Sequence, residues 1–298
     1  MITKRTEVSV FGEVLFDCFP TGEQVLGGAP FNVAWHLQAF GDHPLFISRV
    51  GNDDSGKMIL EEMHNRGMNT NAVQVDAEHP TGRVEVTIND GEPRYDIVAD
   101  SAYDFISIDP LPVTDFEGIL YHGTLGLRSH TARHTFAEIT SNEGVRIFLD
   151  VNLRAPWWQR DEVFGWLYNA TWAKMNEEEL RLLGEPATDV RQQMAELQTS
   201  CGLEQLIVTR GGQDTLIRTA NGKLHSLSPQ KVARPVDTVG AGDAFSAVYI
   251  HGLLAGWPVA ERLRQAQRFA GMIIGLRGAT TTDPLFYKDF ISSLDDRA

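Results

Sequence analysis

Strand-like and helix-like segments alternate along most of the chain, and this alternation restricts the possible folds more than any other feature of the sequence. The apolar segments that read as strands are, in order, 8–16, 45–50, 118–122, 146–150, 172–175 and 205–209. Helical patterns lie between them, for example at 30–40 and 55–66. Parallel strands need long crossover connections, which helices usually supply. The alternation therefore predicts an α/β fold with a mainly parallel central sheet flanked by helices.

The segment near 81–99 interrupts this alternation. Residues 83–88 and 94–98 alternate polar and apolar side chains, and the residues between them favour a turn. This pattern predicts an antiparallel hairpin with one solvated face. Together with residues at about 12–20, the hairpin is expected to form a small β-sheet lid. The lid would be inserted in a single domain that spans residues 1–298.

Charge narrows the classes of partner. The chain has 40 acidic and 26 basic residues, a net charge of −14, which repels phosphodiester backbones and anionic membranes. No nucleic-acid or membrane partner is therefore expected. No apolar run has the length of a signal peptide or a membrane span, and two cysteines, Cys18 and Cys201, cannot form a disulfide framework. These features predict a cytoplasmic protein.

The sharpest local feature is the segment 237–245. Its small residues Gly240, Ala241 and Gly242 lead directly into a long apolar helix predicted at 242–255. Small residues at a helix N-terminus expose several backbone N–H groups, and the helix dipole favours an anion there. Asp243 in the same first turn would be placed to orient or deprotonate an attacking hydroxyl. The alternative is an ordinary glycine-rich turn in which Asp243 stabilises the helix N-terminus.

A second small-residue segment precedes the helix predicted at 30–40. Gly27 and Gly28 lead into its first turn, which carries Asn32, and Asp17 ends the preceding strand. Open α/β sheets place ligands at such strand ends. A carboxylate, an amide and exposed backbone N–H groups suit the hydroxyls of a polyol or sugar. The alternative is a tight strand–helix turn with Asn32 as a cap.

With these two motifs the chain resembles the ribokinase-like sugar kinases, the PfkB family. Residues 27–32 match the N-terminal signature of that family and residues 237–243 match the C-terminal signature. Four shorter similarities lie between them: the turn at 51–56, the strand end at 150–154, the Asn-x-x-Glu motif at 176–179 and the Thr-x-Gly motif at 209–211. The resemblance covers essentially the whole chain and implies a ribokinase-like fold.

The resemblance also implies roles for the matched residues. Asp243 would be the catalytic base, and the backbone N–H groups at 240–243, those of Gly240, Ala241, Gly242 and Asp243, would form the anion hole. The residues expected to bind the sugar or the transferring phosphate are Asp17, Gly28, Asn32 and Arg154. The residues expected to bind the nucleotide are Asn176, Glu179, Thr209 and Gly211.

ATP and Mg²⁺ are the implied phosphoryl donor and metal. Glu179 would contact magnesium through water, as suits an ion that keeps its hydration shell. Asp237 and the carbonyl of Val239 match part of a site for a potassium-like ion. One position departs from the family pattern: the third residue after Gly211 is Asp214, whose carboxylate would oppose nucleotide phosphate.

The opening residues 12–17 and the segment after Gly27 are most similar to the fructokinase branch of the family. The resemblance therefore implies transfer of the γ-phosphoryl group of ATP to a primary hydroxyl of a small sugar, with D-fructose as the first candidate. Ribose, 2-keto-3-deoxygluconate and nucleosides stay open as acceptors. A non-catalytic sugar-sensing protein is the remote alternative. A homodimer paired through the lid is expected.

Overall fold

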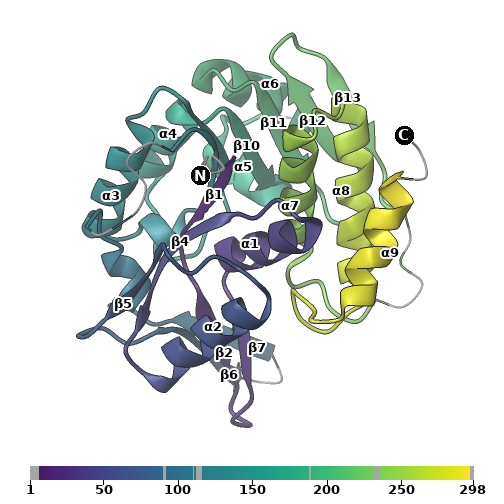
Figure 1. Ribbon diagram of the computed structural model, residues 1–298. Coiled ribbons are helices and arrows are strands. Elements are labelled where there is room, and N and C mark those ends of the chain that lie inside the picture. The colour runs from purple at the N-terminus through teal and green to yellow at the C-terminus, as the bar shows by residue number, and fades with distance from the viewer. Residues whose placement is uncertain are drawn as a thin grey trace, which may run out of the picture.

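A large central sheet with helices on both faces forms the body of the protein, and a smaller sheet projects from it (Figure 1). The computed structural model describes residues 7–89, 92–109, 111, 116–187, 189–230, 232 and 235–295. Both ends of the predicted domain and the tip of the predicted lid hairpin, residues 90–91, lie outside the described residues.

The central sheet has nine strands, and most of them are parallel. In spatial order they are β13 (Leu224–Leu227), β12 (Thr215–Thr219), β11 (Gln205–Thr209), β10 (Trp172–Asn176), β9 (Val145–Asp150), β8 (Gly118–His122), β1 (Val8–Phe11), β4 (Leu45–Gly51) and β5 (Val73–Asp76). Neighbours from β11 to β5 pair in parallel, whereas β12 and β13 form an antiparallel hairpin at one edge. The predicted mainly parallel α/β fold is confirmed.

The helices form two layers, one on each face of the sheet. One layer consists of α1 (Ala29–Phe40), α2 (Asp54–Asn65), α7 (Ala241–Leu254), α8 (Val259–Ile273) and α9 (Pro284–Asp295). The other layer consists of α3 (His130–Thr140), α4 (Arg160–Asn169), α5 (Glu177–Leu183) and α6 (Val190–Cys201), with the short 3₁₀ helices η1 (Ala102–Phe105) and η2 (Leu125–Leu127) nearby. Within the described residues, no helix is long and apolar enough to cross a membrane.

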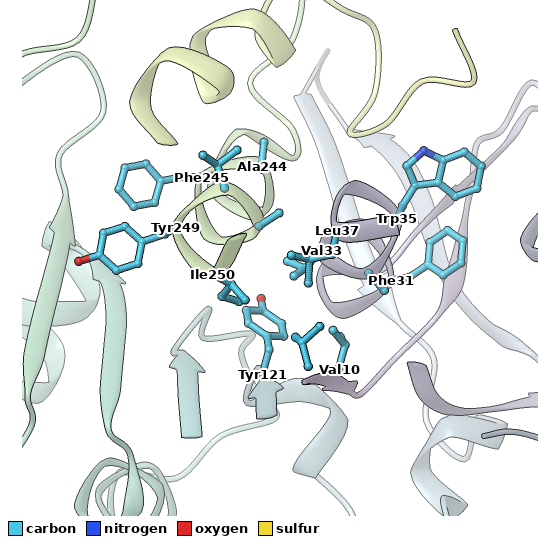
Figure 2. Close-up of a cluster of buried hydrophobic side chains, with 14 of the residues drawn as sticks. Val10, Phe31, Val33, Trp35, Leu37, Tyr121, Ala244, Phe245, Tyr249 and Ile250 are labelled. Atoms are coloured by element: carbon cyan, nitrogen blue, oxygen red, sulfur yellow. The ribbon is translucent and has the colours of Figure 1, made fainter. Parts of the chain in front are cut away.

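Helices α1 and α7 pack beside each other on one face of the sheet. Figure 2 shows Val33 and Leu37 of α1 and Ile250 of α7 gathered above Val10 of β1 and Tyr121 of β8. All five side chains are fully buried. Because apolar burial stabilises a domain in proportion to the area removed from water, this contact fixes the two helices relative to each other. Their N-termini consequently lie at the same edge of the sheet.

The single strand expected over 8–16 is wrong: the chain divides there between two sheets. After β1, Gly12 adopts a φ of +146°, which other residues rarely adopt, and the chain then leaves the central sheet. It continues as β2 (Leu15–Cys18) in the smaller sheet. Every residue from Val8 to Phe16 is buried, so hydrophobicity alone does not mark the break.

The smaller sheet contains the predicted hairpin. Its strands are, in spatial order, β3 (Gln24–Gly27), β2, β6 (Gly82–Asn89) and β7 (Glu92–Ile97). The outer pairs are antiparallel and the central pair, β2 with β6, is parallel. The hairpin was expected from its alternating pattern, whereas β3, β5 and α9 were not anticipated. The two short strands, β3 and β5, have only four residues each.

The apolar layer around α8 gives a prediction for stability. Phe269 is fully buried, and its ring centroid lies 4.6 Å from that of Phe290 and 5.1 Å from that of Phe40. Truncation by Phe269→Ala should lower the free energy of unfolding by about 3–5 kcal/mol because it leaves a cavity. Leu285→Ala, at a side chain that is 62% exposed, is the control and should cost under ~0.5 kcal/mol. Urea denaturation measures both, and equal losses would contradict this packing.

Candidate functional site

The N-termini of α1 and α7 meet where the central strands end. The side chain of Asn32, in the first turns of α1, donates a hydrogen bond of 2.8 Å from Nδ2 to Oδ2 of Asp243 in α7. These residues come from the two sequence motifs and lie 211 positions apart in the chain. The structure therefore brings the predicted sugar-binding and catalytic residues into direct contact.

Gly240 shapes the turn that presents Asp243. It is the N-cap of α7, with a φ of +76°, and Ala241, Gly242 and Asp243 form the first turn. A Cβ at position 240 would lie 2.3 Å from the Cβ of Ala279, so only glycine fits there. The N–H of Ala241 reaches the Thr238 carbonyl at 3.4 Å, and the N–H groups that follow it in the first turn precede the first intrahelical hydrogen bond, which Ala244 donates to Gly240. These first-turn N–H groups have no partner within the helix, as the predicted anion hole requires.

Burial dominates the electrostatics of Asp243. It raises the pKa of this carboxyl to about 6, against the hydrogen bond from Asn32, which lowers the pKa. The Asp150 carboxylate raises the pKa further, whereas Lys174 and Arg154 lower it. Asp243 is therefore mostly ionised at neutral pH but lies close to its titration range, as suits a group that accepts a proton.

Arg154 is the cation that the acidic groups of this site share. It is exposed, and the structure gives it no ion pair with any residue it describes. Burial raises the pKa of Asp17 on β2, and Arg154 opposes that shift. Burial likewise raises the pKa of Glu13, between β1 and β2, to about 7. Arg154 thus lowers the pKa of all three carboxyl groups, Glu13, Asp17 and Asp243.

Two of the predicted sugar-binding residues, Gly28 and Asn32, lie at the start of α1. Gly28 is the N-cap of α1, and its carbonyl accepts the N–H of Asn32 at 2.9 Å. The side chain of Asn32 is 5% exposed, and within the described residues its Oδ1 accepts no hydrogen bond. A buried amide oxygen without a donor can accept a hydrogen bond from a hydroxyl group of a ligand.

Asn176 and Glu179 form a capping box at the start of α5. The side chain of Asn176 accepts the N–H of Glu179, and Glu179 Oε2 accepts the N–H of Asn176, each at 2.8 Å. Glu179 Oε1 accepts the N–H of Leu153, also at 2.8 Å. With both oxygens already bound to backbone N–H groups, Glu179 fits a magnesium ion through a bridging water better than as a direct ligand.

The described residues offer no ready-made metal cage: they contain no cluster of three or more His, Cys, Asp or Glu side chains suited to an ion. Asp237 accepts the N–H of Val239 at 3.0 Å and the N–H of Gly278 at 3.3 Å. It therefore ties two loops together beside the α7 turn. Its role in binding a monovalent cation stays a prediction.

Thr209 and Gly211 lie at the end of β11, next to the residue that departs from the family pattern. Asp214 accepts a 2.6 Å hydrogen bond from Ser226 and forms a 2.6 Å ion pair with Arg210. The Ser226 hydroxyl and then Arg210 hold the pKa of Asp214 below its usual value. Arg210, which also pairs with Glu177 at 3.2 Å, offsets part of the charge of Asp214. This lowers the repulsion of nucleotide phosphate that the sequence led us to expect at this loop.

Sequence reasoning did not single out three buried charged residues here: Glu13, Asp150 and Lys174. All three are at most 5% exposed. Lys174 stands between apolar residues in a short buried strand, which is unusual for lysine and was a signal available in the sequence. Asp150 was noticed only as the first residue of the motif at 150–154.

Asp243 gives a prediction for stability against pH. The folded state raises the pKa of Asp243 from 3.8 to about 6. The protein therefore has its full stability below pH 3.8 and loses part of it as the pH rises through 6, because the buried carboxyl must then be ionised in the folded state. Asp243→Asn should therefore be more stable than the parent at pH 8, by roughly 1–2 kcal/mol, and the difference should fade towards pH 4.

Thermal unfolding at pH 8, 6 and 4 measures this difference. The matched control is Asp161→Asn, at an exposed residue in the first turn of α4, which should lose a few tenths of a kcal/mol (about 0.3–0.5) instead of gaining stability. A gain of the same size at position 161, or none at position 243, would contradict the desolvation of Asp243.

Known proteins resemble this chain along most of its length. The chain is 32% identical over 305 residues to the fructokinase of Klebsiella pneumoniae, covering 95% of this chain and 97% of that protein. The crystal structure of aminoimidazole riboside kinase from Salmonella enterica, with its riboside and an ATP analogue, aligns with a TM-score of 0.82 at 25% identity, covering 96% of this chain and 99% of that one.

A fructokinase double mutant from Vibrio cholerae O395, with fructose, ADP and potassium bound, aligns with a TM-score of 0.83. At 22% identity, over 96% of this chain and 99% of that one, it shows the shared fold alone. Residues 6–285 match the description "pfkB family carbohydrate kinase". This match covers most of the chain, from β1 to the start of α9, and both motif segments lie within it. The chain belongs to the pfkB family of carbohydrate kinases.

Proposed function

We propose that this protein transfers the γ-phosphoryl group of ATP to a primary hydroxyl of a small neutral sugar, with D-fructose as the first candidate. The observation that carries the proposal is the hydrogen bond between Asn32 and Asp243. It joins Asn32, a polar residue of the proposed acceptor site, to the Asp243 carboxylate at the N-terminus of α7. An acceptor hydroxyl bound there would lie beside both a base and an anion hole.

The acceptor half of the site favours hydroxyl groups over anions. Asp17, Glu13 and Asp243 are partly or fully buried carboxyl groups, and the exposed Arg154 acts electrostatically on all three. A sugar phosphate or sugar acid would have to enter this acidic region against repulsion. Carboxylates and the free Oδ1 of Asn32 instead accept hydrogen bonds from sugar hydroxyls.

The phosphate half relies on backbone dipoles. The N–H groups of residues 241–243 would stabilise charge on the transferring phosphoryl group, and Arg154 would add a full positive charge. The acceptor oxygen forms a bond to the γ-phosphorus, the bond to the β-phosphate oxygen breaks, and ADP leaves. Asp243 receives the proton of the hydroxyl. Phosphoryl transfer depends mainly on such positioning and charge stabilisation.

Magnesium bound with ATP would neutralise phosphate charge, and Glu179 would hold it through water in this proposal. Asp237 and the Val239 carbonyl would hold a potassium-like ion beside the α7 turn. The smaller sheet would close as a lid over the acceptor. Its edge strands, β3 and β7, are available for pairing with a second copy, so a homodimer remains part of the proposal.

Asp243→Asn tests the catalytic assignment. We expect turnover to fall by roughly 10³-fold, because a general base contributes about 10²–10⁴ to the rate, while ATP and sugar binding stay close to the parent. A coupled ADP-release assay measures turnover, and calorimetry measures binding. Asp161→Asn is the control and should remain fully active. Parent-like turnover of Asp243→Asn would overturn the role of this residue.

The pH profile of the parent enzyme is a second test. Asp243 must be ionised to accept a proton, and burial places its pKa at about 6. We therefore expect kcat/KM for the acceptor to decline as the pH falls below about 6 and to be level between pH 7 and 8. A profile that stays level down to pH 4.5 would contradict Asp243 as the titrating base.

An acceptor panel tests the substrate. ADP release is compared with fructose, ribose, 2-keto-3-deoxygluconate, aminoimidazole riboside and adenosine, together with fructose 6-phosphate. Fructose should give the highest kcat/KM, and fructose 6-phosphate should give none because of the acidic acceptor half. A higher kcat/KM with ribose or a nucleoside would reassign the acceptor within the family. Sugar binding without ADP release from any acceptor would favour a sensor.

A further inference from the structure

A buried ion pair lies directly beneath the first turn of α7. Lys174 Nζ on β10 is 2.7 Å from Asp150 Oδ2 at the end of β9, and both side chains are at most 7% exposed. A Cβ placed on Gly242 would lie 3.4 Å from Nζ, so the ammonium packs against the turn that carries the anion hole. No role follows for this pair from the proposed acceptor and phosphate sites.

The pair is connected to α7 by hydrogen bonds as well as by packing. Ser246 Oγ, one turn into α7, donates to Asp150 Oδ2 at 2.8 Å and contacts the Gly242 carbonyl oxygen at 3.1 Å. Tyr121 on β8 also donates to Asp150 Oδ2, at 3.3 Å. Three neighbouring strands and the start of α7 thus converge on a single carboxylate.

The ammonium group of Lys174 has more N–H donors than it uses in hydrogen bonds to the described residues. An ammonium group has three N–H donors, and among the described residues only Asp150 accepts one. A buried ion pair seldom improves stability over apolar side chains of the same size, because desolvation offsets the attraction between the charges. Its presence under a functional turn therefore calls for a role other than holding the fold together.

We propose that the Asp150–Lys174 pair is a positioning element that holds the α7 turn at residues 240–242 and sets the charge balance at Asp243. Asp150 anchors the turn through Ser246, and Lys174 supports it at Gly242. Asp150 disfavours the ionised form of Asp243 because it is negative, and Lys174 favours that form because it is positive. The inference rests on the proposed kinase function.

The surroundings of Asp243 allow this role to be tested separately from folding. The titratable and charged groups that act on Asp243 come from β8, β9, β10 and the loops after β1 and β9: Tyr121, Asp150, Lys174, Glu13 and Arg154. Asp150 raises the pKa of Asp243 and Lys174 lowers it. Removing either charge should move the acid limb of the pH–rate profile, and the two removals should move it in opposite directions.

The experiment compares Lys174→Gln, Asp150→Asn and the double variant in full pH profiles. We expect the acid limb of kcat/KM to move up by roughly 0.5–1 pH unit in Lys174→Gln and down by a similar amount in Asp150→Asn. A purely structural pair would lower stability in both variants and leave the acid limb in place. Unmoved limbs, or limbs that move in the same direction, would overturn the proposal.

The double variant keeps the test valid if a single variant fails to fold. It combines Lys174→Gln with Asp150→Asn, so that both charges are removed together and no unpaired charge stays buried. We expect this variant to unfold within a few degrees of the parent, to keep its acceptor KM within about 2-fold, and to lose roughly 10- to 100-fold in kcat. A kcat equal to that of the parent would overturn the proposal.

The matched control is the exposed pair Asp54–Lys57, whose N···O distance is 3.0 Å and whose side chains are 96% and 69% exposed. Asp54→Asn with Lys57→Gln should leave kcat, KM and the acid limb unchanged. The activity of the parent enzyme shows which of the two proposals fails, the kinase function or the positioning role. If the parent releases no ADP with any acceptor, the proposed function fails; if it is active and the variants behave like the control, only the positioning role fails.

Discussion

The hydrogen bond between Asn32 and Asp243 depends on most of the fold. It requires α1 and α7 to begin at the same edge of the sheet, although 211 residues separate the two side chains in the chain. The apolar contact between these helices and the strands below fixes that alignment (Figure 2). Because protein interiors are close-packed, a small shift of either helix would change the geometry of the hydrogen bond between Asn32 and Asp243. Core packing is thus the cause of the site geometry.

The candidate site concentrates negative charge where the proposed reaction would place phosphate. Burial raises the pKa of Glu13 to about 7 and that of Asp243 to about 6, so Glu13 is close to half protonated at neutral pH whereas Asp243 is mostly ionised. This lowers the repulsion that a polyphosphate meets. Backbone N–H groups at the start of α7 and a free guanidinium supply attraction. A protein with a net charge of −14 can therefore bind an anion at one narrow place.

Much of this arrangement could be predicted from the sequence, for identifiable reasons. Gly28 with Pro30, and Gly240 with Gly242, mark helix starts through backbone geometry, which is local information. Residues at about 12–20 were expected to join the lid, but the position of the break after Phe11 could not be predicted, because apolar residues continue on both sides and belong to two sheets. The orientation of a side chain across strands is also non-local information. Lys174 and Asp150 are 24 residues apart, and only parallel pairing of β9 with β10 brings them together.

The same reasoning explains why the sequence predicts the motif that contains Glu179 but does not predict all of the hydrogen bonds that this residue accepts. Its spacing from Asn176 identifies a motif, and the capping box that the two residues form is local to α5. The second carboxylate oxygen of Glu179 accepts the N–H of Leu153, which lies just after the end of β9. Asp150 raises and Lys174 lowers the pKa of Glu179 as well as that of Asp243, so the buried pair links these two residues electrostatically. In the proposed function they are the magnesium-binding and the catalytic residue. A change at either residue of the pair would therefore be felt on both sides.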